Sequence, residues 1–224
     1  IITTFAIEMN MMKLRIHTVL KQIDHFAQNA GRLPAEIQLL AVSKTRTADE
    51  IRQAWQCGLT SFGENYLQEA LNKQTELTDL AIEWHYIGPI QSNKTRRIAA
   101  HFSWVHSVDR LDIARRLSDQ RSEDLPPLQV CLQVNIDDEQ TKSGIQPADL
   151  ETLAHAVASL PRLRLRGLMC IPAPATSLEA QRVPFRQLHG LFDRLIQQGL
   201  ALDTLSMGMS DDLEAAVLEG STLV

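Results

Sequence analysis

Short apolar runs alternate with helix-forming stretches along almost the whole chain. The apolar runs are rich in β-branched and aromatic residues, and glycines often separate them from the stretches that follow. Strands separated by helices of about 10–15 residues are typical of βαβ units, in which neighbouring strands pair in parallel. Seven strands are predicted in this way: Glu36–Ser43, Ser61–Gly63, Trp84–Gly88, Trp104–Val108, Leu128–Asn135, Leu163–Cys170 and Leu202–Gly208.

The number of these units favours a closed barrel over an open sheet. Each strand is followed by a helix, and a stub at Ser221–Val224 stands where an eighth strand would begin, so a chain of 224 residues suits one parallel (β/α)8 barrel of the TIM type. No glycine-rich nucleotide-binding motif follows the first strand, which disfavours Rossmann and P-loop folds. A helix is predicted over Glu8–Asn29, with Gly31 as its stop signal. We expect residues 1–224 to form a single α/β domain, with residues 1–30 packed on the barrel.

Charge and cysteine content narrow the class of protein. A formal net charge of −5 and the lack of a basic tail argue against a nucleic-acid or anionic-membrane binder. The apolar start, Ile1–Asn10, lacks the basic region and cleavage site of a signal peptide, and no later stretch reaches the roughly 18 apolar residues that a membrane span needs. Cys57, Cys131 and Cys170 have no CxxC spacing and are expected to be free thiols. We therefore expect a cytoplasmic protein.

Lys44 is the first candidate for chemistry. Residues at the C-terminal ends of barrel strands form the active sites of such folds, and Lys44 directly follows the first predicted strand. Packing of its stem there would desolvate the amine and lower its pKa, and the neutral amine is the form that attacks a carbonyl. The alternative is a lysine that reaches solvent at a strand end and has no chemical role.

The turn Met207–Asp212 is the second candidate. It contains Gly208 and leads into a helix, so backbone N–H groups and the Ser210 hydroxyl could receive a phosphate. An ordinary helix cap, with Ser210 or Asp211 as the capping residue, is the alternative.

Other polar residues are assigned structural roles. His85, His101 and His106 do not have the spacing of a helical metal pair, so they are expected to pack or to lie at the surface, and no metal site is predicted. Asp137–Glu139 is interpreted as a solvated loop. Lys142, in the same loop, is a second lysine that could lie over the barrel mouth.

Six blocks of this sequence resemble the pyridoxal phosphate homeostasis protein family (YggS/PROSC). They occur in the family's order between Glu36 and Val224, and together they are highly specific. The blocks are Ala41–Thr45, Phe62–Tyr66, Trp84–Lys94, Lys142–Gly144, Arg166–Met169 and Ser206–Asp212.

The resemblance implies a barrel like the N-terminal domain of alanine racemase, with pyridoxal 5'-phosphate (PLP) as its cofactor. It implies that Lys44 is the Schiff-base lysine, that Asn65 lies beside the cofactor ring, and that Ser206, Gly208 and Ser210 hold the phosphate. Family members are described as monomers that control intracellular PLP and related B6 vitamers. Transient contact with PLP-dependent enzymes is part of this expectation.

A binding role is expected in place of catalysis. Two-base racemisation needs proton donors on both faces of the substrate, and a single barrel supplies no opposing domain. Tyr66 is the only tyrosine near the predicted mouth, and we expect it to pack in the helix after the second strand. The alternatives are a PLP-dependent racemase or decarboxylase, a PLP-free lyase that uses Lys44, and an interaction scaffold.

The resemblance departs from the family pattern at its last residues. In the family, an Arg-Ile-Gly-Thr stretch and a final helix follow the segment equivalent to Gly220–Val224. We therefore expect strand eight to be short, the barrel to be partly open, and the cofactor to lack the contacts that the arginine and the Gly-Thr pair would make.

Overall fold

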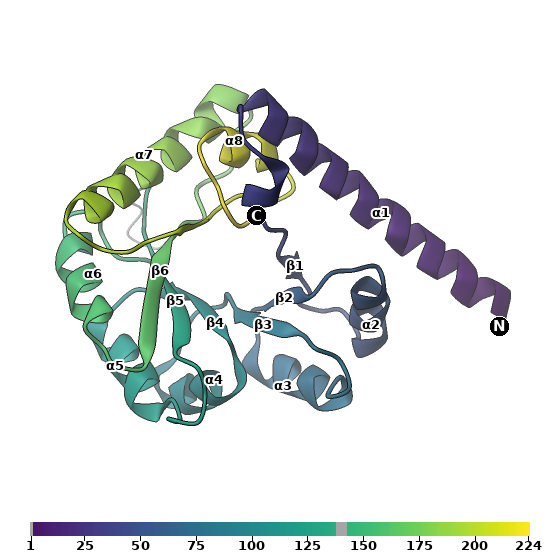
Figure 1. The fold of residues 1–224 in the computed structure, drawn as a ribbon, viewed down its shortest axis with the longest axis horizontal. Helices are drawn as coiled ribbons and strands as arrows, with labels where there is room; N and C mark the ends of the chain where they lie inside the picture. Colours follow the sequence, from purple (N-terminus) through teal and green to yellow (C-terminus); the bar gives the residue numbers. More distant parts are fainter. Residues whose placement is uncertain (1, 138–142) are drawn as a thin grey trace.

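The computed structural model describes residues 2–137 and 143–224, and a curved parallel sheet lies at the centre of this part of the chain. Its seven strands follow one another in chain order, and the sheet curls so that the helices lie outside it (Figure 1). This arrangement is the α/β barrel that the strand–helix alternation predicts. The strands are β1 (Ala41–Val42), β2 (Ser61–Glu64), β3 (Glu83–Tyr86), β4 (Trp104–Val108), β5 (Leu128–Gln133), β6 (Leu163–Met169) and β7 (Thr204–Ser206).

Side-chain caps mark the start of α2 and α7. The Thr47 side chain accepts a hydrogen bond from the Glu50 N–H, and the Glu50 side chain accepts one from the Thr47 N–H, which forms a capping box at the start of α2. Ser177 accepts a hydrogen bond from the Ala180 N–H and caps α7, which contains Pro184. The helices are α1 (Ile2–Asn29), α2 (Ala48–Gln56), α3 (Leu67–Glu76), α4 (Thr95–His101), α5 (Leu111–Gln120), α6 (Leu150–Ala158), α7 (Leu178–Gln197) and α8 (Leu213–Leu218), with short 3-10 helices at Pro34–Glu36 and Ser92–Lys94.

The N-terminal helix is longer than predicted. It begins at Ile2 where the sequence pattern indicated Glu8, because neither glycine nor proline interrupts the preceding residues. Ile23 and Ala27 are buried against Leu213 and Val217 of α8, while the N-terminal end of α1 lies at the periphery of the molecule (Figure 1). No helix within the described ranges is long and apolar enough to cross a membrane.

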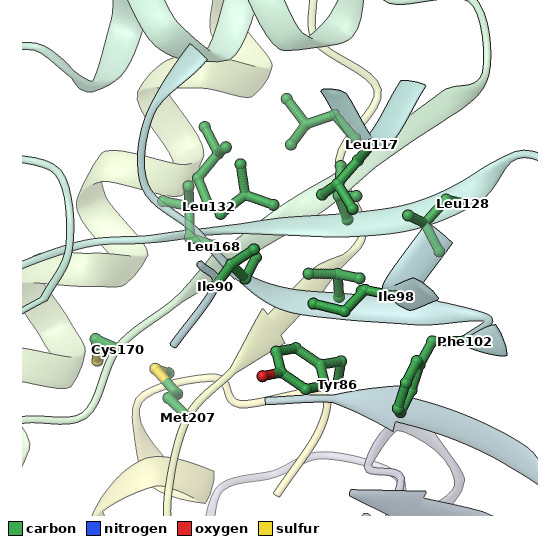
Figure 2. Packing of buried hydrophobic residues seen from close by; sticks show 14 of the residues in the cluster. Tyr86, Ile90, Ile98, Phe102, Leu117, Leu128, Leu132, Leu168, Cys170 and Met207 are labelled. Carbon is green, nitrogen blue, oxygen red and sulfur yellow. The ribbon is translucent and has the colours of Figure 1, made fainter. Parts of the chain in front are cut away.

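The hydrophobic core fills the space within the sheet and between the sheet and its helices. Tyr86 and Phe102 are almost fully buried, with ring centroids 5.2 Å apart in an edge-to-face arrangement. Ile98, Leu117 and Leu128 pack in the same cluster (Figure 2). Each buried side chain of this size stabilises the fold by about 1.5–3 kcal/mol relative to its exposed form.

The last residues of the chain join the two edges of the sheet. The Met207 N–H donates to the Leu223 carbonyl over 3.1 Å, and the Gln38 and Leu40 N–H groups donate to the Thr222 and Val224 carbonyls over 2.9 and 2.8 Å. The eighth strand position is thus held by isolated bridges, which confirms the expected short strand. Within the described part of the chain, β1 itself pairs with β2 alone, so closure does not extend along the whole barrel.

The first strand is much shorter than Glu36–Ser43. Pro34 begins a 3-10 turn that includes Glu36, and Gln38 makes a single bridge to Leu223 before β1 starts at Ala41. A proline donates no backbone hydrogen bond and favours the start of a helical turn, which delays the strand.

Candidate functional site

A cavity of about 550 Å³ opens at the C-terminal ends of the barrel strands. All five residues that the sequence singled out line it: Lys44 follows β1, Asn65 follows β2, Ser206 ends β7, and Gly208 and Ser210 lie in the next loop. This is the end of a parallel barrel at which active sites are found, and the volume suits a small organic ligand.

The cavity wall also contains residues that the sequence did not suggest. Cys170 and Met207 belong to the buried core cluster drawn in Figure 2 and line the cavity from the ends of β6 and β7. Arg15, Val19 and Gln22 of α1 line it from outside the barrel. The position of α1 relative to the strands is a tertiary feature, and no local motif in α1 indicates it.

Lys44 lies in a turn, and its side chain is exposed. The expected packing of its stem is therefore wrong, and this structure provides no burial that would desolvate its amine. Thr45 has a φ of 64°, an uncommon left-handed conformation for a residue other than glycine. This conformation makes a short turn, which places the Lys44 side chain at the cavity.

A buried ion-pair network holds this turn. Lys73 is 5% exposed and donates to the Ser43 carbonyl over 2.7 Å and to Glu64 Oε1 over 2.7 Å. It also contacts Glu69, whose Oε1 accepts from the Thr45 N–H over 2.6 Å. The residues before and after Lys44 are therefore fixed by charge-assisted hydrogen bonds, which are stronger than neutral ones.

Asn65 brings an unpaired acceptor to the cavity. Its Oδ1 atom is buried and has no hydrogen-bond partner among the described residues, a state that costs free energy unless a ligand or water pairs with it. Its backbone is packed closely by Gly88, where a Cβ would lie 2.1 Å from the Asn65 carbonyl oxygen. Only glycine at position 88 permits this approach.

The loop after β7 is shaped by a second glycine. Gly208 has a φ of +104°, and a Cβ there would lie 2.5 Å from the Ala216 Cβ. Asp212 stands at the N-cap of α8, and its Oδ1 accepts from the Met209 N–H over 2.5 Å. The alternative in which Ser210 or Asp211 caps the helix is thus wrong, and Ser210 is an exposed residue of the cavity wall.

Two histidines assigned to packing form part of a polar chain that ends at the site. His106 Nδ1 lies 2.8 Å from Ser206 Oγ, and His106 Nε2 lies 2.9 Å from His85 Nδ1. Both rings are fully buried, whereas His101 is exposed at the end of α4. The register pairs His85 with Trp104, and His106 lies two residues further along β4, so all three share one face of the sheet. To predict this contact from the sequence, the pairing register of β3 and β4 would have been needed.

Several further predictions have separate outcomes. Tyr66 precedes α3 and is 60% exposed, so the prediction that it packs in that helix is wrong. Lys142, Asp138 and Glu139 lie outside the described residues. Within the described ranges, no three histidine, cysteine or acidic side chains gather as a metal site requires. Cys57, Cys131 and Cys170 are free thiols, as predicted.

The sequence comparisons identify close relatives along nearly the full chain. Residues 20–224 match the family model described as alanine racemase, N-terminal domain. The pyridoxal phosphate homeostasis protein of Pseudomonas aeruginosa is 60% identical over 216 residues, which cover 96% of this chain and 93% of that protein. The protein of the same name from Escherichia coli K12 is 52% identical over 219 residues, covering 96% and 94%.

The structural comparisons agree with the sequence comparisons. PipY of Synechococcus elongatus, solved with PLP bound, is similar with a TM-score of 0.79 and 40% identity, covering 90% of this chain and 95% of PipY. Alanine racemase of Clostridium difficile has a TM-score of 0.69 at 14% identity and covers 92% of this chain and 54% of the racemase, a likeness of fold alone. The chain belongs to the pyridoxal phosphate homeostasis protein family, and its barrel has the fold of the alanine racemase N-terminal domain.

Proposed function

We propose that this protein binds PLP in the cavity, as a Schiff base with Lys44, and serves vitamin B6 homeostasis. The observation that carries the proposal is the convergence of Lys44, Asn65, Ser206, Gly208 and Ser210 on one cavity, in a relative of PLP-bound PipY. The names of the curated relatives support the homeostasis role.

The residues of the cavity fit the chemical groups of PLP. The cofactor supplies an aldehyde, a ring hydroxyl and a phosphate. Lys44 offers the only primary amine among the described lining residues, and the unpaired Asn65 Oδ1 suits a hydroxyl donor. Gly208 lets the backbone approach closely, and Ser206 and Ser210 provide hydroxyl groups for the phosphate end.

The same lining supports binding without turnover. A racemase needs a second group that exchanges protons opposite its lysine. Of the described lining residues, Cys170 is a poor proton acceptor because burial raises the pKa of its thiol well above the ordinary value. Asp212 already accepts a hydrogen bond from the Met209 N–H. PLP-dependent racemisation or decarboxylation remains the alternative function.

The proposal extends to the domain organisation, the location and the partners of the protein. Residues 1–224 form one domain, supported by the continuous sheet and by the contacts of α1 with α8. The protein acts as a cytoplasmic monomer, accepts other B6 vitamers, and hands PLP on through transient contact with PLP-dependent enzymes. Neither nucleic acid nor membrane is a partner.

Titration of the purified protein with PLP tests the proposal. We expect the visible absorbance band of a lysine-bound cofactor in the wild type and its loss in Lys44→Ala, with Lys21→Ala as a control because Lys21 is an exposed lysine on α1. Borohydride reduction followed by peptide mass analysis should place the added mass on Lys44. A band that persists in Lys44→Ala contradicts the proposal, and racemised or decarboxylated amino acids would favour the enzymatic alternative.

A further inference from the structure

A continuous chain of hydrogen bonds crosses the barrel interior to the cavity. It runs from Glu83 at the start of β3, through His85 and His106, to Ser206 at the end of β7. The separations are 3.1 Å between Glu83 Oε2 and His85 Nε2, 2.9 Å between the two imidazoles, and 2.8 Å between His106 Nδ1 and Ser206 Oγ. The Glu83 side chain is 43% exposed, whereas both histidines are fully buried, so solvent reaches the end of the chain remote from the cavity.

The carboxylate of Glu83 sets the direction of every bond in the chain. It accepts from Trp104 Nε1 and Ser61 Oγ as well as from His85, and the hydrogen bond from His85 holds the pKa of Glu83 below its usual range. Burial lowers the pKa of His85, and burial together with His85 lowers that of His106, so each ring carries one proton at neutral pH. His85 therefore donates from Nε2 and accepts at Nδ1.

The same constraint passes from ring to ring. His106 must donate from Nε2 to His85, which leaves its Nδ1 as an acceptor, and Ser206 must then donate its hydroxyl proton to that nitrogen. In this state the Ser206 oxygen presents only lone pairs to the cavity. It cannot donate a hydrogen bond to a phosphate dianion.

One added proton reverses the direction of the hydrogen bonds from His85 to Ser206. His85 then carries protons on both nitrogens and donates from Nδ1 to His106 Nε2, and the His106 proton resides on Nδ1 and is donated to Ser206 Oγ. The Ser206 hydroxyl proton becomes available to an anion in the cavity. The two states differ by one proton, which comes from solvent or from a monoprotonated phosphate, and it resides on His85 against the Glu83 carboxylate.

The charged surroundings of His85 permit this added proton. The Trp104 ring stacks on the His85 ring, with 5.3 Å between the ring centroids. The Arg166 guanidinium lies over the Trp104 ring, 4.7 Å from its centroid. Arg166 is itself paired with Asp203, with 2.7 Å between Nη2 and Oδ2. The Arg166 charge is thus balanced locally, and Glu83 is the counter-charge in direct contact with His85.

We propose that the chain Glu83–His85–His106–Ser206 couples the binding of a phosphate dianion in the cavity to the uptake of one proton. His106 acts as a positioning residue, because its protonated nitrogen decides whether Ser206 donates or accepts. This inference deepens the proposed function and rests on it in one respect, namely that the phosphate end of the ligand lies at Ser206.

Sulfate is the probe that isolates the effect, because it remains a dianion throughout the working range whereas a phosphate monoester titrates near pH 6. We expect the sulfate dissociation constant of the wild type to rise with pH above the ordinary histidine pKa of about 6.5, with a limiting slope of about tenfold per pH unit, the slope for uptake of one proton. Nitrogen NMR of histidine-labelled protein should show His85 becoming an imidazolium when sulfate binds, and this readout needs no variant.

Glu83→Gln removes the counter-charge while keeping the shape of the side chain. The pH dependence of sulfate binding by Glu83→Gln should move to lower pH, with weaker binding at neutral pH. Glu123→Gln should match the wild type, because the Glu123 carboxylate is 86% exposed and pairs with Arg162. Sulfate affinity that does not change with pH, or histidine signals that do not change on binding, would overturn the coupling. Failure of sulfate to bind the PLP-free protein would overturn it too, provided that the same protein gives the PLP band when PLP is added. Loss of the PLP band itself would instead count against the proposed function.

Discussion

Lys73 shows how a single residue can govern the geometry of a site that it does not line. It is buried with Glu64, which is fully buried, and its ammonium is shared between two carboxylates and the Ser43 carbonyl. A buried charge without its partner is strongly unfavourable, because no water replaces the lost interaction. The network therefore links the stability of the barrel to the conformation of the turn that carries Lys44.

We expect Lys73→Met to lower the free energy of unfolding by about 3–5 kcal/mol, since the Glu64 carboxylate is left buried without a counter-charge. Denaturant unfolding at neutral pH measures the loss. The double variant Lys73→Met with Glu64→Gln removes both charges and should recover a large part of it. A single variant as stable as the wild type would show that the ion pair contributes nothing net.

At the scale of elements, helix α2 depends on its first turn. Its capping box satisfies backbone donors that would otherwise lack partners, and the helix follows directly on the turn after Lys44. The bond from the Thr47 backbone N–H holds the pKa of Glu50 below its usual value. A lowered pKa in the folded state means that this stabilisation is present above the ordinary carboxyl pKa and is lost as pH falls through the folded value.

Thr47→Ala should therefore destabilise the protein by about 0.5–2 kcal/mol, as the loss of an N-cap hydroxyl does in other helices. Thermal or denaturant unfolding measures the change. Thr47→Ser keeps the hydroxyl acceptor and should remain close to the wild type. An equal loss in both variants would point to the threonine methyl group and contradict the role of the cap.

At the scale of the whole molecule, Leu223 connects the two edges of the curved sheet. This residue is 4% exposed, lines the cavity, and bridges β7 on one side and the segment before β1 on the other. Closure of the sheet thus uses the same residues that bound the ligand cavity. The opposite side of β1, within the described residues, has no second strand beside it.

Leu223→Ala should lower the free energy of unfolding by about 2–5 kcal/mol, the range for a buried leucine. It should also increase amide hydrogen exchange at Gln38, Leu40 and Met207, whose N–H groups donate to Thr222–Val224. Leu195→Ala, a buried leucine in α7, should cost a similar free energy without this selective change in exchange. Equal exchange patterns in the two variants would contradict a closing role for Leu223.

The sequence by itself determined the elements and the class of fold. Apolar runs and glycines act over a few neighbouring positions, so strands and helices could be predicted, and parallel pairing followed from the order of the elements. Lys44 and the turn with Gly208 and Ser210 were also predicted from their positions at strand ends, because parallel strands bring their C-terminal ends together, whereas Asn65 and Ser206 were implied by the family resemblance.

Only the tertiary structure decided the details that depend on register and packing. The hydrogen-bonded pair His85 and His106 requires the pairing of β3 with β4, and the exposure of Lys44 requires the turn held by Lys73 and Glu69. The placement of Arg15 beside the cavity requires the docking of α1 on α8. Apart from the Lys73–Glu69 pair within α3, these contacts join residues far apart in the chain, and their free energy comes from burial and ion pairing that local sequence does not encode.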